Sequence, residues 1–380
     1  MIDQLISELV AYGLENGLID DADKVYVTNG LLELFQRQDY QEPEKLGKPR
    51  KLQLILDDLL EYALSQGILE DDTVTMRDLL DTKIMGILTP APSVVRKIFE
   101  EKYQVSPKAA TEFYYHFSQA TNYIRTDRII KDEKWETDTE FGKMDITINL
   151  SKPEKDPRDI AKAGTAKKSG YPACLLCREN EGYAGHLSHP ARQNHRIIPI
   201  TLCGEQYYLQ YSPYVYYNEH CIIFNKNHIP MAINKITFNK LLDFVKQFPH
   251  YMAGSNADLP IVGGSILSHD HFQGGSYVFA MAKAPYEQEF DLDRYPDIHV
   301  GIVKWPMSVI RLQGRAMDSI VAAANHILTK WRGYSDPEVN IFSETDGIPH
   351  NTITPIARMR GDLYELDLVL RNNITTIDCP

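Results

Sequence analysis

The chain has 380 residues, of which 43% are apolar and 24% are charged, and its formal net charge at pH 7 is −12. This length and composition suit a folded protein with a sizeable core and exclude a disordered chain. The acidic balance argues against a general binder of nucleic acid or of membrane surfaces, because both need basic patches. The start lacks a basic stretch followed by an apolar run, and no apolar segment is long enough to span a bilayer. We therefore expect a cytoplasmic protein.

Residues 1 to about 130 show the apolar periodicity of amphipathic helices. One apolar stripe runs over residues 2–14 and another over residues 52–64. A further helix is expected over residues 93–103, after a break that contains two prolines. These stripes favour helix packing and carry no catalytic motif. The sequence therefore predicts a helical N-terminal region over residues 1–140.

Beyond this region the apolar period changes from that of helices to that of strands. Residues 144–150 alternate as a strand does, and residues 151–168 are polar and typical of a loop. Further strands are expected over residues 197–200, 207–210, 215–217, 221–224, 276–280, 299–303, 308–310, 352–359 and 363–370. Helices are expected over residues 238–248 and 316–331. The pattern predicts an α+β fold, in which a helical region precedes an antiparallel sheet with helices.

The most informative stretch is residues 263–275, which reads GGSILSHDHFQGG. If it is extended, alternation puts His269, His271 and Gln273 on one face. Its glycines let backbone N–H groups approach a charged ligand, which suits a phosphate. We predict that His271 is a nucleophile, because an imidazole nitrogen can attack phosphorus and hold the phosphoryl group covalently. Gln273 can donate its amide to a phosphoryl oxygen where charge develops. The alternative is that both histidines merely face solvent at a strand end.

A second motif is the pair Cys174 and Cys177, two of the five cysteines of the chain. In a chain without an export signal, such a pair favours metal binding or redox chemistry over a disulfide. Zinc takes thiolate and imidazole ligands in a tetrahedral array, so two histidines must complete the set. We predict His269 and His228 as these partners, with His220 as the alternative to His228. The competing interpretation is a pair of adjacent thiols without a metal.

The loop that follows the cysteine pair carries Arg192 and Arg196. Arginine can contact a phosphate through two parallel N–H donors. We therefore predict that both residues bind a substrate phosphate, although a solvated loop is equally compatible with the pattern.

Three motifs together resemble the hexose-1-phosphate (galactose-1-phosphate) uridylyltransferases, in particular their second, bacterial class. They are CLLC at 174–177, YYNEH at 216–220 and the 263–275 segment, and the similarity runs to about Asn373. The family belongs to the histidine-triad superfamily, so the resemblance implies a catalytic histidine-triad-like half over residues 141–290 and a second such half over 291–380. It also implies transfer of UMP from UDP-glucose to galactose 1-phosphate, which gives UDP-galactose and glucose 1-phosphate in galactose metabolism.

The resemblance assigns roles to individual residues. It implies a ping-pong mechanism in which His271 carries the uridylyl group and Gln273 contacts the transferred phosphoryl group. Asn256 and Gly264 fall near the family's phosphate-contacting positions. In the first class of the family, zinc is bound by residues that correspond in order to Cys174, Cys177, His228 and His269. The resemblance also implies a homodimer.

The C-terminal end departs from the family pattern. After residue 373 the family continues into a histidine-rich stretch, whereas this chain reads ITTIDCP over residues 374–380. We therefore expect a truncated second half, which affects the dimer contact and the hexose-phosphate pocket. Two alternative functions follow. One is a histidine-triad nucleotide hydrolase or phosphorylase, and the other is an inactive homologue that only binds sugar nucleotides.

Overall fold

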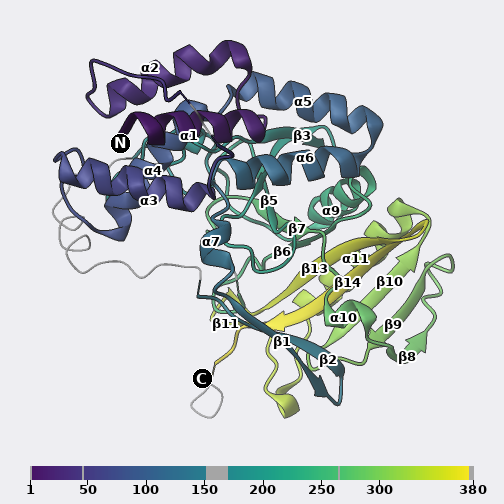
Figure 1. Cartoon of the computed structure of the whole chain (residues 1–380). Helices are drawn as coiled ribbons and strands as arrows, with labels where there is room; N and C mark the ends of the chain where they lie inside the picture. Colours follow the sequence, from purple (N-terminus) through teal and green to yellow (C-terminus); the bar gives the residue numbers. More distant parts are fainter. Residues whose placement is uncertain (1, 45–46, 151–169, 264–265, 376–380) are drawn as a thin grey trace. The chain divides into compact units, whose positions relative to one another are not determined.

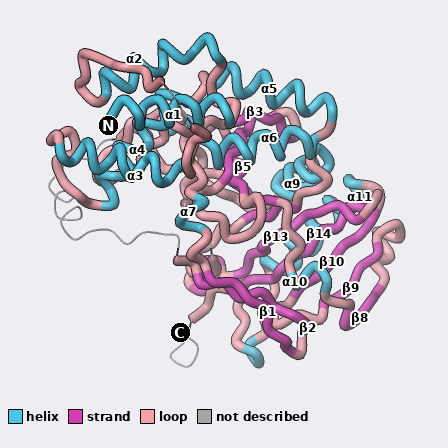
Figure 2. The backbone as a smooth tube through the Cα atoms, viewed as in Figure 1, coloured by secondary structure: helices cyan, strands magenta, loops and turns pink. Residues whose placement is uncertain are grey.

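The computed structural model describes residues 2–44, 47–150, 170–263 and 266–375, so the predicted loop over 151–168 lies outside the described residues. The chain divides into two compact units, Met1–Glu133 with Asn149–Ile198 and Lys134–Ile148 with Pro199–Pro380. Helices dominate the first unit and strands the second (Figure 2), and the predicted α+β class is confirmed. Within the described part of the chain, no helix combines the length and apolar character that crossing a membrane requires. The predicted division at residues 140 and 290 stays a prediction.

The first unit consists mainly of helices, as predicted for residues 1 to about 130 (Figure 1). They are α1 (Ile2–Glu15), α2 (Lys24–Leu34), α3 (Leu52–Ser65), α4 (Val74–Leu88), α5 (Pro92–Val105), α6 (Pro107–Ala120) and α7 (Thr126–Ile129). Helices α5 and α6 begin with proline, whose missing N–H has no intrahelical partner at that position. Ser106 Oγ accepts a hydrogen bond from Ala109 N at 3.0 Å and so caps α6. The predicted stripes face inward, since Ile6, Leu9 and Ile55 are all fully buried.

The second unit begins with a hairpin of β1 (Glu133–Thr139) and β2 (Gly142–Ile148), which form a two-stranded sheet. The strand predicted over residues 144–150 is confirmed for most of its length. Strand β1 was not predicted, because its residues are all exposed and its sequence, EKWETDT, lacks apolar alternation. The hydroxyl of Tyr277 donates to the carboxylate of Asp145, which ties the hairpin to the rest of the unit.

A ten-stranded sheet organises the rest of the second unit, and its order is β3-β4-β5-β7-β6-β13-β14-β10-β9-β8. The strands are β3 (Ile198–Leu202), β4 (Glu205–Tyr211), β5 (Cys221–Asn225), β6 (Met252–Ser255), β7 (His271–Gly275), β8 (Tyr286–Phe290), β9 (His299–Val303), β10 (Val309–Gly314), β13 (Asn351–Arg360) and β14 (Leu363–Asn372). Short strands β11 (Glu344–Thr345) and β12 (Ile348–Pro349) form a separate pair.

Helices α9 (Lys235–Gln247) and α11 (Met317–Arg332) pack against each other and against β13, so they cover the same face of the sheet. Asn234 and Thr237 form a reciprocal capping box at the start of α9. The covered face is apolar, with Phe272, Leu366 and Leu368 buried. Alternation directs the neighbouring side chains of β7 and β14 to the opposite face.

The sheet contains the same five-strand arrangement twice. In chain order, β3-β4-β5-α9-β6-β7 is followed by β8-β9-β10-α11-β13-β14, and the two sets meet where β6 pairs with β13. Across this junction, Gln273 pairs with Gly254, Gly254 with Ile356, and Ile356 with Asp367. Asp367 therefore occupies the place in the second set that Gln273 occupies in the first, and Glu365 the place of His271. The expected incompleteness of the second half stays a prediction.

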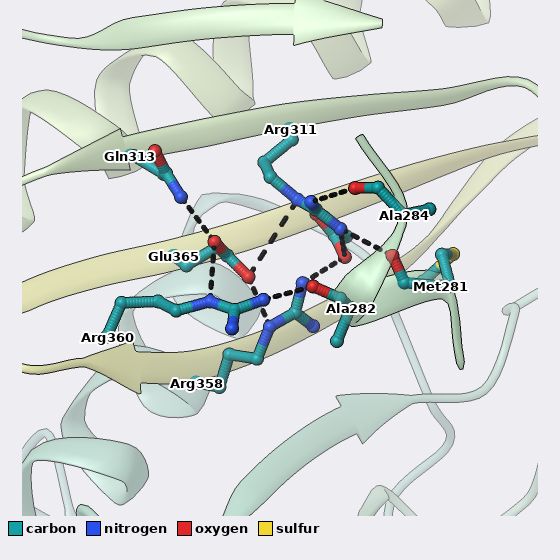
Figure 3. Close-up of polar contacts among 9 residues, drawn as sticks. Met281, Ala282, Ala284, Arg311, Gln313, Arg358, Arg360 and Glu365 are labelled. Carbon is teal, nitrogen blue, oxygen red and sulfur yellow. Dashed lines mark hydrogen bonds and ion pairs between the residues drawn. The ribbon is translucent and has the colours of Figure 1, made fainter. Parts of the chain in front are cut away.

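The carboxylate of Glu365 lies among the guanidinium groups of Arg311, Arg358 and Arg360 (Figure 3). Glu365 is fully buried, contacts Arg358 and accepts from Arg360 Nε at 3.0 Å. Asp367 accepts from Arg311 Nε at 2.6 Å and also contacts Arg358. Burial raises the pKa of Glu365, but the surrounding guanidinium groups outweigh this effect and hold its pKa below the usual value. In the second set, two carboxylates that are paired with arginines thus occupy the positions of the predicted catalytic pair.

Two strand predictions are wrong. Residues 276–280 do not extend β7, because its neighbours β5 and β6 begin opposite Gly274 and Gly275 and offer no partner beyond them. Helix α10 (Ala280–Lys283) follows instead. Residues 215–217 lie outside the ladder between β4 and β5, whose pairing ends where Tyr211 meets Cys221. The ring of Tyr217 packs against His220 and Tyr277 instead.

Candidate active site

His271 and Gln273 project from β7 on the face opposite α9 and α11. They share this face, as the alternation predicted. His269 is different, because it lies in a bend before the strand begins, although it is also buried, with 1% exposed. The expectation that all three residues share one strand face therefore holds for two of them.

The ring of His271 is held in one tautomer. Its Nδ1–H donates to the backbone carbonyl of His269 at 2.7 Å, so the lone pair is on Nε2. The side-chain amide of Asn256 lies 3.3 Å from Nε2. Burial lowers the pKa of His271, whereas the bond to His269 and the charge of Asp270 oppose that shift. A buried neutral imidazole with its lone pair on Nε2 can act as a nucleophile.

Three polar side chains continue from His271. Gln273 Nε2 donates to Asn256 Oδ1 at 3.1 Å, which places the two predicted phosphate contacts side by side. His220 Nε2 lies 3.1 Å from Gln273 Oε1, and its Nδ1 lies 3.0 Å from the carbonyl oxygen of Tyr214. His220, the alternative zinc ligand, thus contacts Gln273. Sequence reasoning missed this role, although the residue stands in the YYNEH motif.

In the first unit, Cys174 and Cys177 lie close together without forming a disulfide. Their Sγ atoms are 3.5 Å apart, well beyond the ~2.05 Å of an S–S bond. Asn180 Nδ2 donates to the backbone carbonyls of Cys174 at 2.8 Å and of Cys177 at 2.7 Å. Burial, together with the neighbouring Cys174, raises the pKa of Cys177 to about 12. A bound cation would reverse this shift, because it stabilises the thiolate.

In the second unit, the rings of His228 and His269 lie 4.9 Å apart, measured between their centroids. His269 Nε2–H donates to the backbone carbonyl of Asn225 at 2.8 Å, so the lone pair of the neutral ring is on Nδ1. Each unit therefore presents half of the predicted ligand set, and two thiolates with two imidazoles match the preference of zinc.

A buried polar cluster holds the backbone between the two histidines, and sequence reasoning missed it. Asp270 Oδ2 accepts from the hydroxyl of Tyr207 at 2.5 Å, and Lys240 Nζ donates to the same hydroxyl at 2.8 Å. Lys240 also pairs with Glu205 at 2.9 Å. Burial, followed by the charge of Asp270, raises the pKa of Tyr207 above its usual range. The available signal was Lys240 itself, a charged residue within the apolar stripe of a helix.

The remaining predicted site residues lie in the first unit or outside the described residues. Arg196 is buried and donates to four backbone carbonyls, among them those of Pro90 and His195, both at 2.7 Å. Arg192 lies over the ring of Tyr123, 5.4 Å from its centroid. The phosphate contacts predicted for both arginines stay predictions, and that of Arg196 would require its backbone bonds to be exchanged. Gly264 lies outside the described residues.

Family models and individual relatives of this chain all indicate the same protein family. The family models described as galactose-1-phosphate uridyl transferase, N-terminal domain and C-terminal domain, match residues 17–230 and 243–378. The galactose-1-phosphate uridylyltransferase of Clostridium acetobutylicum is 56% identical over 380 residues, which cover 100% of this chain and 76% of that protein. The protein of the same name from Butyrivibrio fibrisolvens is 57% identical over 97% of this chain and 94% of its own length.

Among solved structures, yeast Ap4A phosphorylase aligns with 10% identity and a TM-score of 0.36, over 74% of this chain and 83% of that one. The family assignment depends on the sequence matches, which cover most of this chain and include the segments that carry His271 and Gln273. This chain belongs to the galactose-1-phosphate uridylyltransferase family.

Proposed function

We propose that this chain transfers UMP from UDP-glucose to galactose 1-phosphate through a uridylyl group held on His271. The observation that carries the proposal is the tautomer of His271, whose Nδ1–H is engaged by a carbonyl at 2.7 Å and whose Nε2 is therefore unprotonated. Family membership supports the choice of substrates. The partners are accordingly UDP-glucose, UDP-galactose and hexose 1-phosphates.

The reaction consists of two displacements at one phosphorus. In the first, the lone pair of His271 Nε2 forms a bond to the α-phosphorus of UDP-glucose, and glucose 1-phosphate leaves with the electron pair of the broken P–O bond. In the second, a phosphate oxygen of galactose 1-phosphate attacks the same phosphorus, and the P–N electron pair returns to Nε2. The Nδ1–H bond stabilises the positive charge that the ring carries while it is uridylylated. Gln273 and Asn256 donate amide hydrogens to the phosphoryl oxygens.

We also propose that Cys174, Cys177, His228 and His269 bind one Zn²⁺, each through one ligand atom. The donor set supports this proposal, because zinc prefers thiolate and imidazole ligands. When bound, the ion would stabilise the thiolate forms of the two cysteines. His269 would then hold both the metal and, through its carbonyl, the Nδ1 proton of His271.

Arg192, Arg196 and Gly264 complete the proposed phosphate-binding residues. The proposal includes the cytoplasmic location, the homodimer, and the three-part division at residues 140 and 290, all expected from the sequence.

The experiment that tests this function is incubation of the chain with uridine-labelled UDP-glucose without an acceptor. We expect label on the denatured protein that is labile in acid and stable in base, as for a phosphoramidate. Subsequent galactose 1-phosphate should release the label as UDP-galactose. His271→Ala should abolish labelling, whereas the matched control His299→Ala, on the partly exposed side of β9, should label normally. Continuous release of UMP without an acceptor would instead favour a hydrolase, and labelling of His271→Ala would exclude this nucleophile.

A further inference from the structure

His220 lies at one end of a hydrogen-bond chain that reaches the nucleophile. Its Nδ1 contacts the carbonyl oxygen of Tyr214 at 3.0 Å, and its Nε2 contacts Gln273 Oε1 at 3.1 Å. Gln273 Nε2 then contacts Asn256 Oδ1 at 3.1 Å, and Asn256 Nδ2 contacts His271 Nε2 at 3.3 Å. The chain ends where His271 Nδ1 contacts a second backbone carbonyl, at 2.7 Å.

The number of hydrogens available along this chain indicates which of its contacts His220 donates. The carbonyls at both ends of the chain only accept, so the five contacts need five hydrogens from the four side chains between them. Two amides and two neutral imidazoles supply one hydrogen each along the chain, which leaves one contact without a hydrogen. Since His271 Nε2 carries a lone pair, Asn256 and Gln273 both donate in its direction, and His220 Nε2–H then donates to Gln273 Oε1. The contact without a hydrogen is the one between His220 Nδ1 and Tyr214 when the ring is neutral.

This count does not depend on how the two amides are turned. Burial lowers the pKa of His220, whereas its bonds to Tyr214 and Gln273 oppose the shift. The neutral ring that burial favours still donates from Nε2 to Gln273 Oε1.

Packing keeps His220 in this place. Its side chain is buried, with 3% exposed, and the rings of Tyr216 and Tyr217 lie 5.3 and 4.6 Å from it, measured between centroids. Without a donor at this position, the amide of Gln273 can reverse, and that of Asn256 with it. The Oδ1 atom of Asn256 would then face Nε2 of His271, and an acceptor rather than a donor would lie beside the position of the transferred phosphoryl group.

We propose that His220 is a positioning residue for uridylyl transfer, which holds the amides of Gln273 and Asn256 with their N–H₂ groups directed toward His271 Nε2. The inference rests on the proposed function, because it assumes that His271 receives the uridylyl group. His220 acts through Gln273 and is assigned no contact with the reacting atoms.

The test compares His220→Leu, which removes the donor, with His220→Gln, whose amide can donate from a similar distance along the side chain. The measured quantity is the first-order rate of label transfer from UDP-glucose to the protein, together with KM, melting temperature and zinc content. We expect His220→Leu to lower this rate on the order of 10- to 100-fold, the range seen when hydrogen-bond partners that orient metal-binding residues are removed. KM, melting temperature and zinc content should change little, and His220→Gln should recover most of the rate. The control His299→Leu should leave the rate unchanged.

Three outcomes would overturn the inference. Wild-type labelling rates in His220→Leu would show that the chain does not need this residue. Equal losses in both variants, accompanied by a lower melting temperature, would mean that His220 only supports the fold. Loss of zinc in His220→Leu would make it a metal ligand. If the wild-type protein itself fails to label, the proposed function is wrong, which separates that failure from a failure of this inference.

Discussion

Replacing Glu365 with glutamine should destabilise the protein by about 3–5 kcal/mol, the usual cost of removing one partner from a buried ion pair. Glu365 is fully buried and contacts the guanidinium groups of Arg358 and Arg360, while Arg311 Nε lies 3.8 Å away. Glutamine keeps the shape of the side chain but removes its charge. Asp367 is then the remaining carboxylate that compensates these arginines. The amide N–H₂ group of glutamine also faces the N–H groups of the guanidinium ions, so hydrogen-bond donors oppose one another.

The assay is thermal unfolding followed by circular dichroism. Each kcal/mol corresponds to about 2–4 °C in a domain of ~150–250 residues, so we expect a fall of about 6–20 °C in melting temperature. The matched control is Asp362→Asn. Asp362 pairs with Arg315 at 3.5 Å, but the two side chains are 86% and 74% exposed, so its loss should cost at most about 1 kcal/mol. If both variants melt within the same narrow range as the wild type, the reasoning about buried charge is wrong.

Three further predictions concern stability and metal binding. The pKa of Glu365 is lower in the folded protein than in the unfolded chain, so the stability that its carboxylate contributes is present above the unfolded-state pKa and is lost as pH falls through the folded-state pKa. The difference in melting temperature between the wild type and Glu365→Gln should therefore shrink below pH 5. Asn234→Ala removes the cap of α9 and should cost about 1 kcal/mol, measured by urea unfolding, and an unchanged midpoint would contradict this. Cys174→Ser should reduce zinc in elemental analysis from about one ion per chain to near zero, and equal zinc in both proteins would exclude the proposed ligand set.

Much of the candidate site was predictable because its residues are close together in the sequence. His271 and Gln273 are two positions apart, so strand alternation is enough to place them on one face. Asn256 was placed near the phosphate by the family resemblance, and its amide contacts both residues. His269 departs from the pattern because the strand begins only at His271. Local periodicity does not predict the residue at which a strand begins, because that residue depends on where the neighbouring strands begin to pair with it.

The hydrogen-bond partners of the site residues could not be predicted from the sequence, for a different reason. His220 and Gln273 are separated by 53 positions, and Lys240 and Tyr207 by 33. Nothing in the local pattern of either residue indicates which distant side chain satisfies it. Such pairings become defined only when the register of the sheet and the packing of α9 bring the groups together.

The sequence by itself determined the α+β class, the helical N-terminal region, the segment that carries His271 and Gln273, and the family, because apolar periodicity and short motifs are local properties. The tertiary structure decided the tautomer of His271, the contact between His220 and Gln273, and the order of the ten strands. It also decided that Glu365 and Asp367 occupy, in the second set of strands, the places of His271 and Gln273. These features arise from contacts between residues far apart in the chain, and such contacts form only once the sheet has formed.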